Sequence, residues 1–216
     1  YNVYGDIDKY IISIYLVNKD LKKKRKNGLI INFETFFNKK LLEIEKISLS
    51  DIARDLDIPK ESVRRKILYL EKKGVIKKIK RKIFVNRSAL SSVRVNSAIK
   101  EISLLLHEFN KILNEEKEIN VVFGINKIES SIKENYSFCW YQLYKFLFVY
   151  TNRWRNVIND LETFCIGMLV VLNAAANKKF DPSKKSLKTY HNEIMGSDLK
   201  GVNAMSISEI TGSPRP

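Results

Sequence analysis

The most regular alternation of apolar and polar positions lies between residues 48 and 86. Leu49, Ile52, Ala53 and Leu56 recur at helical spacing, which predicts a short amphipathic helix. Ser48 stands before it as a candidate N-cap, three residues ahead of an acidic residue that can complete a capping box. This stretch therefore begins with a well-delimited helix that has one buried face.

A second helix is predicted directly afterwards, beginning at Pro59, whose missing N–H needs no partner in a first helical turn. Val63, Ile67 and Leu70 form its apolar stripe, and Gly74 predicts where it ends. Two β-prone segments then flank a polar tip at residues 80 and 81, which predicts a two-stranded ribbon. The apolar residues of these segments are Val75, Ile76, Ile83, Phe84 and Val85.

This order of helix, turn, helix, glycine and ribbon resembles the winged helix-turn-helix domain of bacterial transcription regulators of the MarR and GntR type. The resemblance implies binding of double-stranded DNA, with the second helix in the major groove and the ribbon, or wing, along the backbone. The residues that carry the resemblance are Ser48, Ile52, Ala53, Leu56, Ile58, Val63, Ile67, Leu70, Glu71, Gly74, Val75 and Ile76.

Two sets of DNA-binding residues follow from this interpretation. The recognition helix would present Lys60, Glu61, Ser62, Arg64 and Arg65. One of its two arginines would grip a guanine; the competing use is phosphate contact or, for Arg65, a pair with Glu61 four residues earlier. The wing would place Lys77, Lys78, Lys80, Arg81 and Lys82 on phosphates, with Arg81 the better candidate for a minor groove. A wing that binds nothing is the alternative.

The distribution of charge agrees with a polyanionic partner. The 216-residue chain has a net charge of +15, and its segment from Asp51 to Arg87 contains 13 basic and 5 acidic residues. The chain is also rich in Lys, Ile and Asn together, so part of its lysine content reflects a general compositional bias. The local excess is therefore more informative than the total.

The flanking segments are predicted to be mostly helical. Residues 6 to 18 suit an amphipathic helix, and residues 21 to 28 (LKKKRKNG) suit a solvated basic loop, with direct contact to phosphate as the alternative role of the basic run. Residues 33 to 44 are expected to form the first helix of the winged domain. A long helix from Ser91 to Asn114 follows the wing, and its apolar seam at heptad spacing suits either packing within the chain or a dimer contact. The seam consists of Val95, Ala98, Ile102, Leu105, Phe109 and Ile112.

Residues 136 to 177 are helical in pattern and apolar on almost every face. Such a helix is expected at the centre of a bundle or in a subunit interface. Its aromatic residues also leave open a small-molecule effector pocket. The candidates for that pocket are Trp140, Tyr141, Tyr144, Tyr150 and Trp154.

The C-terminal segment repeats the opening theme, because residues 205 to 210 match residues 47 to 52 in character. We therefore expect a second helix-turn-helix that begins here and continues past Pro216; a single capped helix is the alternative. The predicted architecture is mainly α, with a winged helix-turn-helix and a helical bundle. The predicted divisions are 1–32 (helix and basic loop), 33–90 (winged domain), 91–180 (helical core or dimerisation region) and 181–216 (linker and second motif).

Signals for catalysis are few. His107 and His191 stand far apart, and the sequence contains neither an H-E-x-x-H motif nor a glycine-rich phosphate loop. We expect no enzyme activity, cofactor or metal. Cys139 and Cys165 lie in apolar contexts and are expected to be buried free thiols in a reducing cytosol. The longest apolar run, residues 164 to 176, is too short to span a bilayer, so we expect a cytoplasmic protein without a membrane partner.

These observations favour a dimeric transcriptional regulator that binds specific DNA sequences. Two alternatives remain open at this stage. A plasmid- or phage-type replication or partition initiator can also carry two winged domains on one chain. A helical scaffold whose winged domain binds protein would use the same elements without DNA.

Overall fold

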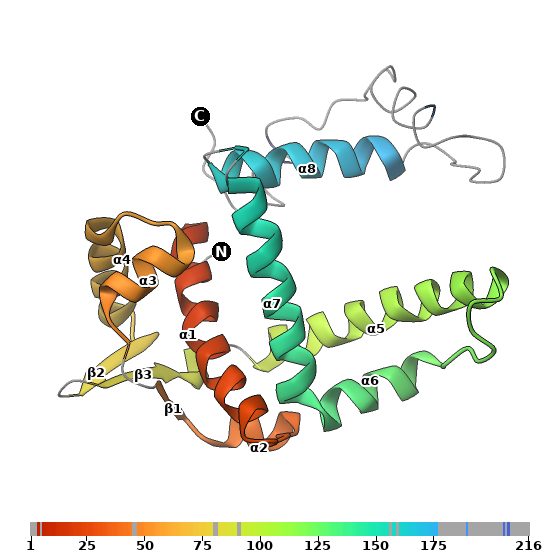
Figure 1. Cartoon of the computed structure of the whole chain (residues 1–216), viewed down its shortest axis with the longest axis horizontal. Coiled ribbons are helices and arrows are strands. Elements are labelled where there is room, and N and C mark those ends of the chain that lie inside the picture. The colour runs from red at the N-terminus through yellow and green to blue at the C-terminus, as the bar shows by residue number, and fades with distance from the viewer. Residues whose placement is uncertain are drawn as a thin grey trace. The chain divides into compact units, whose positions relative to one another are not determined.

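The computed structural model describes residues 4, 6–44, 47–79, 82–89, 92–155, 157–158, 160–176, 189, 205 and 207. Within them are eight α-helices and a three-stranded antiparallel sheet (Figure 1). The chain divides into two compact units, one formed by Asp8–Val149 and the other including the described residues from Tyr150 onward. The elements are α1 (Ile7–Lys26), α2 (Phe33–Asn38), β1 (Leu41–Ile44), α3 (Leu49–Leu56), α4 (Lys60–Lys72), β2 (Ile76–Ile79), β3 (Lys82–Asn86), the 3₁₀ turn η1 (Arg87–Ala89), α5 (Ser92–Glu115), α6 (Ile125–Glu134), α7 (Tyr136–Arg155) and α8 (Leu161–Ala176).

The helix pair α3–α4 forms as its apolar pattern predicts. Ser48 caps α3, and its side chain and that of Asp51 bond reciprocally to each other's backbone N–H groups. Val63, Ile67 and Leu70 of α4 are completely buried. After α4, Gly74 adopts φ +70°, and the N–H of the next residue bonds back to the carbonyl of Leu70 at 2.9 Å.

The ribbon predicted after α4 is present as β2 and β3. Strand β3 pairs with both neighbours in the order β1-β3-β2, and all pairs are antiparallel. Val85 lies opposite Ile76 of β2 and Leu42 of β1, and all three are buried. One face of the sheet therefore belongs to the core, and the alternate residues face outward.

The expectation of one helix over residues 33 to 44 is wrong. Helix α2 ends at Asn38, and Leu41–Ile44 is the strand β1, in which Leu42 and Ile44 are buried and the alternate residues are exposed. The apolar residues Leu41, Leu42 and Ile44 do not alternate strictly with polar ones, and pairing with β3, distant in sequence, selects the strand.

Helix α1 provides the additional contacts to α3 and α4. The Tyr15 hydroxyl donates to Asp55 of α3 at 2.6 Å. Near the start of α1, Asp8 pairs with Lys66 of α4 at 3.3 Å, and Lys9 lies 3.8 Å from the ring centroid of Tyr69. The three helices α1, α3 and α4 thus pack together.

The solvated loop expected at residues 21 to 28 is also wrong, because α1 continues to Lys26. Leu21 is completely buried and holds this part of the helix to the core. Lysine and arginine are good helix formers, and their charges suit the last turn of a helix. Gly28, at φ +68°, closes the helix, with bonds from its own N–H to Arg25 and from the Leu29 N–H to Lys24.

An aromatic core joins α2 to α7. The rings of Phe36 and Tyr136 are 5.0 Å apart, and Tyr136 stacks on Trp140 at the same distance. The guanidinium of Arg87 is buried beside them, 4.2 Å from the Phe36 ring, and donates to the Phe36 carbonyl. This cluster fixes the start of α7 against the end of the sheet.

Helix α7 is buried on one face only, which differs from the expectation of burial on all sides. Tyr136, Trp140 and Tyr144 are buried, whereas Phe146 and Val149 are more than 60% exposed. Apolar residues outside the buried face of α7 are left exposed by the described part of this chain. Whether another subunit covers them stays a prediction.

Helix α5 matches its prediction closely, and α6 runs back along it. His107 bonds through Nδ1 to the Phe123 carbonyl at 2.7 Å, and the Phe123 N–H donates to the Asn110 side chain at the same distance. His107 therefore has a structural role in the connection between α5 and α6. The two bonds hold the α5–α6 connection along α5, and residues 121 to 124 are neither strand nor helix.

The second unit contains the end of α7 and all of α8. Trp154 stacks on Phe164 at 4.9 Å between ring centroids, and the Asp160 carboxylate accepts from two backbone N–H groups at the start of α8. Cys165 is exposed, which corrects the expectation that it is buried. Most of the predicted second helix-turn-helix, including Ser206 and Glu209, lies outside the described residues. Over the described part of the chain, no helix combines the length and apolarity that a membrane crossing requires.

Candidate nucleic-acid interface

The outward face of α4 is the side of the helix opposite its buried apolar stripe. With Val63, Ile67 and Leu70 in the core, both Arg64 and Arg65 are exposed. The Arg64 Nε donates to Glu61 at 2.9 Å, whereas Arg65 makes a longer contact of 3.4 Å with the Ser62 hydroxyl. The alternative pairing of Arg65 with Glu61 does not form, because Arg64, one turn from Glu61 at spacing three, takes that carboxylate.

The remaining positions of α4 divide between the surface and the interior contacts. Lys60 is exposed at the first residue of the helix, on the same side as Arg64. Lys66 instead turns toward α1 and pairs with Asp8. Leu68 is 48% exposed, three residues after Arg65 and four after Arg64, so an apolar group lies among the cations of the outward face.

The ribbon adds a second set of cations next to α4. Lys77 and Lys82 lie on the outward face of the sheet, and Lys82 pairs with Glu43 of β1 at 2.5 Å. Lys78 lies on the opposite face and pairs with Glu71 of α4 at 3.5 Å. Among the described carboxylates none pairs with Lys77. Lys80 and Arg81, the predicted tip, lie outside the described residues.

The carboxylate of Asp55 links α1 to α3 next to this basic region. Asp55 accepts from the Tyr15 hydroxyl at 2.6 Å, from Lys19 at 3.0 Å and from Arg54 at 3.2 Å. The hydrogen bond from Tyr15, together with the two cations, lowers the pKa of Asp55 to about 2. Burial and the same bond raise the pKa of Tyr15 well above its ordinary value. Asp55 thus stays ionised and ties α1 to α3.

A further basic surface, absent from the predicted set, lies on α1. Lys19, Lys22, Lys23 and Lys26 follow the spacing i, i+3, i+4 and i+7, which places them on one helical face. The spacing itself is the signal that could have identified them. In a loop these lysines would share no face, so their spacing is informative only if this segment is helical.

The five aromatic residues predicted to line an effector pocket divide between the two units. Trp140 and Tyr144 belong to the aromatic core, and Tyr150 and Trp154 belong to the second unit. Tyr141 lines a cavity of about 410 Å³, which it shares with Tyr15 and with the half-buried Asn18 and Phe148. Across the described residues no group of three or more His, Cys, Asp and Glu side chains could hold a metal ion.

Comparison with known protein families, with curated proteins and with solved structures found no match.

Proposed function

We propose that α3, α4 and the β2–β3 ribbon form a winged helix-turn-helix that binds specific sequences of double-stranded DNA, and that the protein is a dimeric transcriptional regulator. The observation that carries the proposal is the division of α4. Three apolar residues are completely buried, and the opposite side presents Lys60, Arg64 and Arg65 to solvent. Such a helix is held rigidly by one face while the other is free to enter a major groove.

The elements around α4 support this assignment. A helix and a tight turn precede α4, and the ribbon follows it directly. Strand β1 completes the sheet in the order β1-β3-β2. The cations of the ribbon would lie on phosphates and add affinity without sequence information. Sequence would then be read by α4 alone.

Arg65 is the better candidate for reading a base. Its contact with Ser62 is long, whereas Arg64 is already engaged by Glu61. A guanidinium can form two hydrogen bonds with guanine, and each such pair contributes about 1–3 kcal/mol of discrimination. Arg64 would then keep its ion pair with Glu61 or break it to contact a phosphate. That ion pair is exposed, so breaking it costs about 0–1 kcal/mol.

Dimerisation is supported by α5. Leu105, Phe109 and Ile112, three residues of its heptad seam, are 68%, 54% and 55% exposed. The segment from Ser92 to Glu134 contains 6 basic and 7 acidic residues, so two copies would meet without the repulsion expected elsewhere on this cationic chain. A two-fold dimer would recognise half-sites about one helical turn of DNA apart, or a multiple of that distance.

The test begins with selection of a preferred duplex from a random library. Its affinity is then compared with that of a scrambled duplex of equal length. We expect Arg64→Ala with Arg65→Ala to remove most of the preference while non-specific binding persists. Lys100→Ala with Lys111→Ala, on α5, removes the same charge and should retain the preference. If selection enriches no sequence, or both variants discriminate as the wild type does, the proposal is wrong.

A second candidate, recognition of protein by the same face, is favoured by one observation. Leu68 is an exposed apolar residue on the outward face of α4, one turn after Arg64 and Arg65. In a DNA complex it would contact a thymine methyl group; in a protein complex it would be an anchor. Leu68→Gln should change the preferred bases at one position in the first case. If the face binds protein instead, neither the wild type nor the Leu68→Gln variant would bind the duplex.

A further inference from the structure

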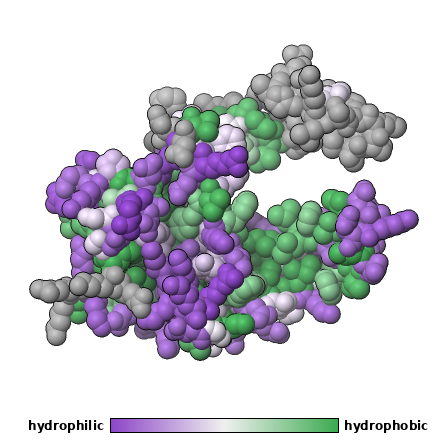
Figure 2. All heavy atoms as spheres, in the orientation of Figure 1, coloured by the Kyte–Doolittle hydropathy of each residue, from purple (hydrophilic) through white to green (hydrophobic). Residues whose placement is uncertain are grey.

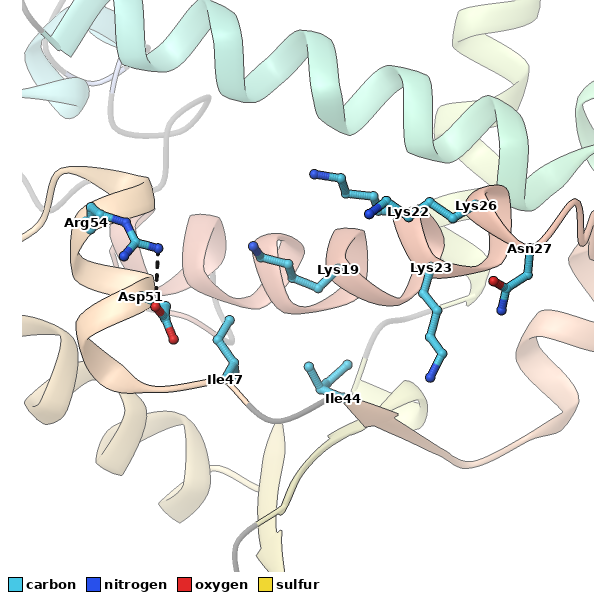
Figure 3. Close-up of a pocket in the computed structure, with 9 residues that line it drawn as sticks. All are labelled: Lys19, Lys22, Lys23, Lys26, Asn27, Ile44, Ile47, Asp51 and Arg54. Carbon is cyan, nitrogen blue, oxygen red and sulfur yellow. Dashed lines mark hydrogen bonds and ion pairs between the residues drawn. The ribbon is translucent and has the colours of Figure 1, made fainter.

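A basic cavity of about 500 Å³ lies between α1 and α3, with Ile44 and Ile47 on its floor (Figure 3). Its charged lining consists of Lys19, Lys22, Lys23 and Lys26 of α1 with Asp51 and Arg54 of α3. In Figure 3, Lys23 and Asn27 extend from α1 toward the side on which Ile44 and Ile47 lie. Arg54 closes the opposite end and is linked to Asp51. Five cations and one carboxylate therefore line this space, with Lys22 and Lys26 extending from α1 on the side away from the two isoleucines in Figure 3.

The single carboxylate in this lining is already engaged. Asp51 accepts from the backbone N–H and the hydroxyl of Ser48, at 3.0 and 2.7 Å, and from Arg54 at 3.2 Å. The bonds from Ser48 lower the pKa of Asp51, so it remains an anion committed to the cap of α3. It does not neutralise the lysines across the cavity.

Two of the lysines have no partner among the described residues. Lys19 donates to Asp55, and Lys24, which points elsewhere, pairs with Asp20. Lys22 and Lys26 are exposed and pair with no described carboxylate. A lysine-rich last turn also stabilises a helix through its dipole, but that effect does not require the lysines to share one face opposite an arginine. The shared face concentrates positive potential in the cavity.

We propose that this cavity binds two or more adjacent phosphate groups. The ammonium groups along α1 and the guanidinium of Arg54 at one end suit the charge and the acceptor oxygens of linked phosphates, whose binding would relieve the repulsion among the lysines. The phosphates could be supplied by the DNA backbone, which would extend the duplex contact beyond α4, or by a free polyphosphate ligand. The site requires no contact with α4 and does not depend on sequence reading.

The experiment uses the full chain and two probes, inorganic tripolyphosphate and a duplex of random sequence. Lys22→Ala with Lys26→Ala removes the two unpaired cations, and alanine preserves the helix. Lys100→Ala with Lys111→Ala is the control with equal charge loss. Calorimetry at low salt measures tripolyphosphate, and a salt series measures the duplex. Circular dichroism checks that each variant is folded.

We expect the cavity variant, and not the control, to weaken tripolyphosphate binding at least about tenfold. If the DNA backbone is the source, the cavity variant also weakens duplex binding and lowers the salt slope by about 1.8, near 0.9 for each lost phosphate contact. If a free polyphosphate is the source, duplex binding by the two variants is equal. The proposal is overturned if the variants are indistinguishable with both probes. That failure is separate from loss of sequence preference in the Arg64→Ala, Arg65→Ala variant.

Discussion

The surface of α3, α4 and the ribbon and the surface of α5 and α6 differ in both charge and exposed apolar area. From Asp51 to Arg87 the basic residues outnumber the acidic ones by 13 to 5, while the segment Ser92–Glu134 is almost neutral. Figure 2 shows the contrast, with hydrophobic residues gathered over α5 and hydrophilic ones over the helices and ribbon that precede it. The two surfaces therefore suit different partners.

The difference has an energetic basis. A cationic face gains from a polyanion and repels a second copy of itself, whereas an apolar face gains from any partner that removes it from water. Leu104, Leu105 and Phe109 of α5 are half or more exposed, and Val121 of the connection beside them is 55% exposed. In the proposed dimer these side chains would be covered while the lysines stayed free to contact DNA.

The largest expected effect comes from removing a buried apolar side chain from α4, compared with removing an exposed one from α5. Ile67→Ala opens a cavity in a completely buried site and should lower the free energy of unfolding by about 2–5 kcal/mol. Leu105→Ala removes a side chain that is 68% exposed and should cost less than about 0.5 kcal/mol in the monomer. Urea unfolding at low protein concentration measures both. Equal losses would show that α5 is packed within the chain.

The next effect concerns self-association. Leu105→Glu with Phe109→Glu should weaken a dimer at least about 100-fold, because burying two carboxylates in an apolar interface is costly. Leu29→Glu with Ile30→Glu places the same charges on exposed apolar residues between α1 and α2 and should leave association unchanged. Light scattering across a concentration series gives the mass. A wild-type protein that remains monomeric would remove α5 as a dimer surface.

Acid should affect the two regions unequally. Asp55 has a folded pKa of about 2, below its unfolded value, so its stabilising contribution is present at neutral pH and is lost as pH falls from about 4 to about 2. Allowing for its partial exposure, Asp55→Asn should cost about 1–2 kcal/mol at pH 7 and flatten this acid limb.

The matched control for that experiment is Glu101→Gln on α5, since Glu101 is exposed. Its unfolding free energy and acid limb should follow those of the wild type. Unfolding curves from pH 7 to pH 2.5 make the comparison. An Asp55→Asn variant that keeps the wild-type acid limb would show that the bonds to Tyr15 and Lys19 do not hold α1 in place.

Local pattern was sufficient for the parts of the fold that are stabilised locally. The capping box at Ser48, the stripe of α4 and the stop at Gly74 all follow from neighbours within a few residues, and each is confirmed. Strand β1 does not follow from the local pattern, because its partner β3 lies about 40 residues away and no local signal decides between helix and strand there.

The candidate sites differ in the same way. Exposure of Arg64 and Arg65 could be predicted because it is the complement of the buried stripe, whereas the choice of Arg64 as the partner of Glu61 depends on side-chain geometry. The lysine face of α1 can be predicted only if the helix is known to continue to Lys26. The burial of Leu21 holds this part of the helix to the core. Its position opposite Arg54 follows only from tertiary packing.

The smallest effect tests whether the ribbon, unlike α5, lies on DNA. Lys77 is exposed on the outward face of β2, so Lys77→Ala should remove one phosphate contact and lower the slope of log K against log salt by about 0.9. The loss should be the same for selected and scrambled duplexes, because a lysine on phosphate carries no sequence information. Lys100→Ala on α5 removes an equal charge and should leave the slope unchanged. If both lysines lower it equally, long-range charge rather than contact determines affinity, and the distinction between the two surfaces fails.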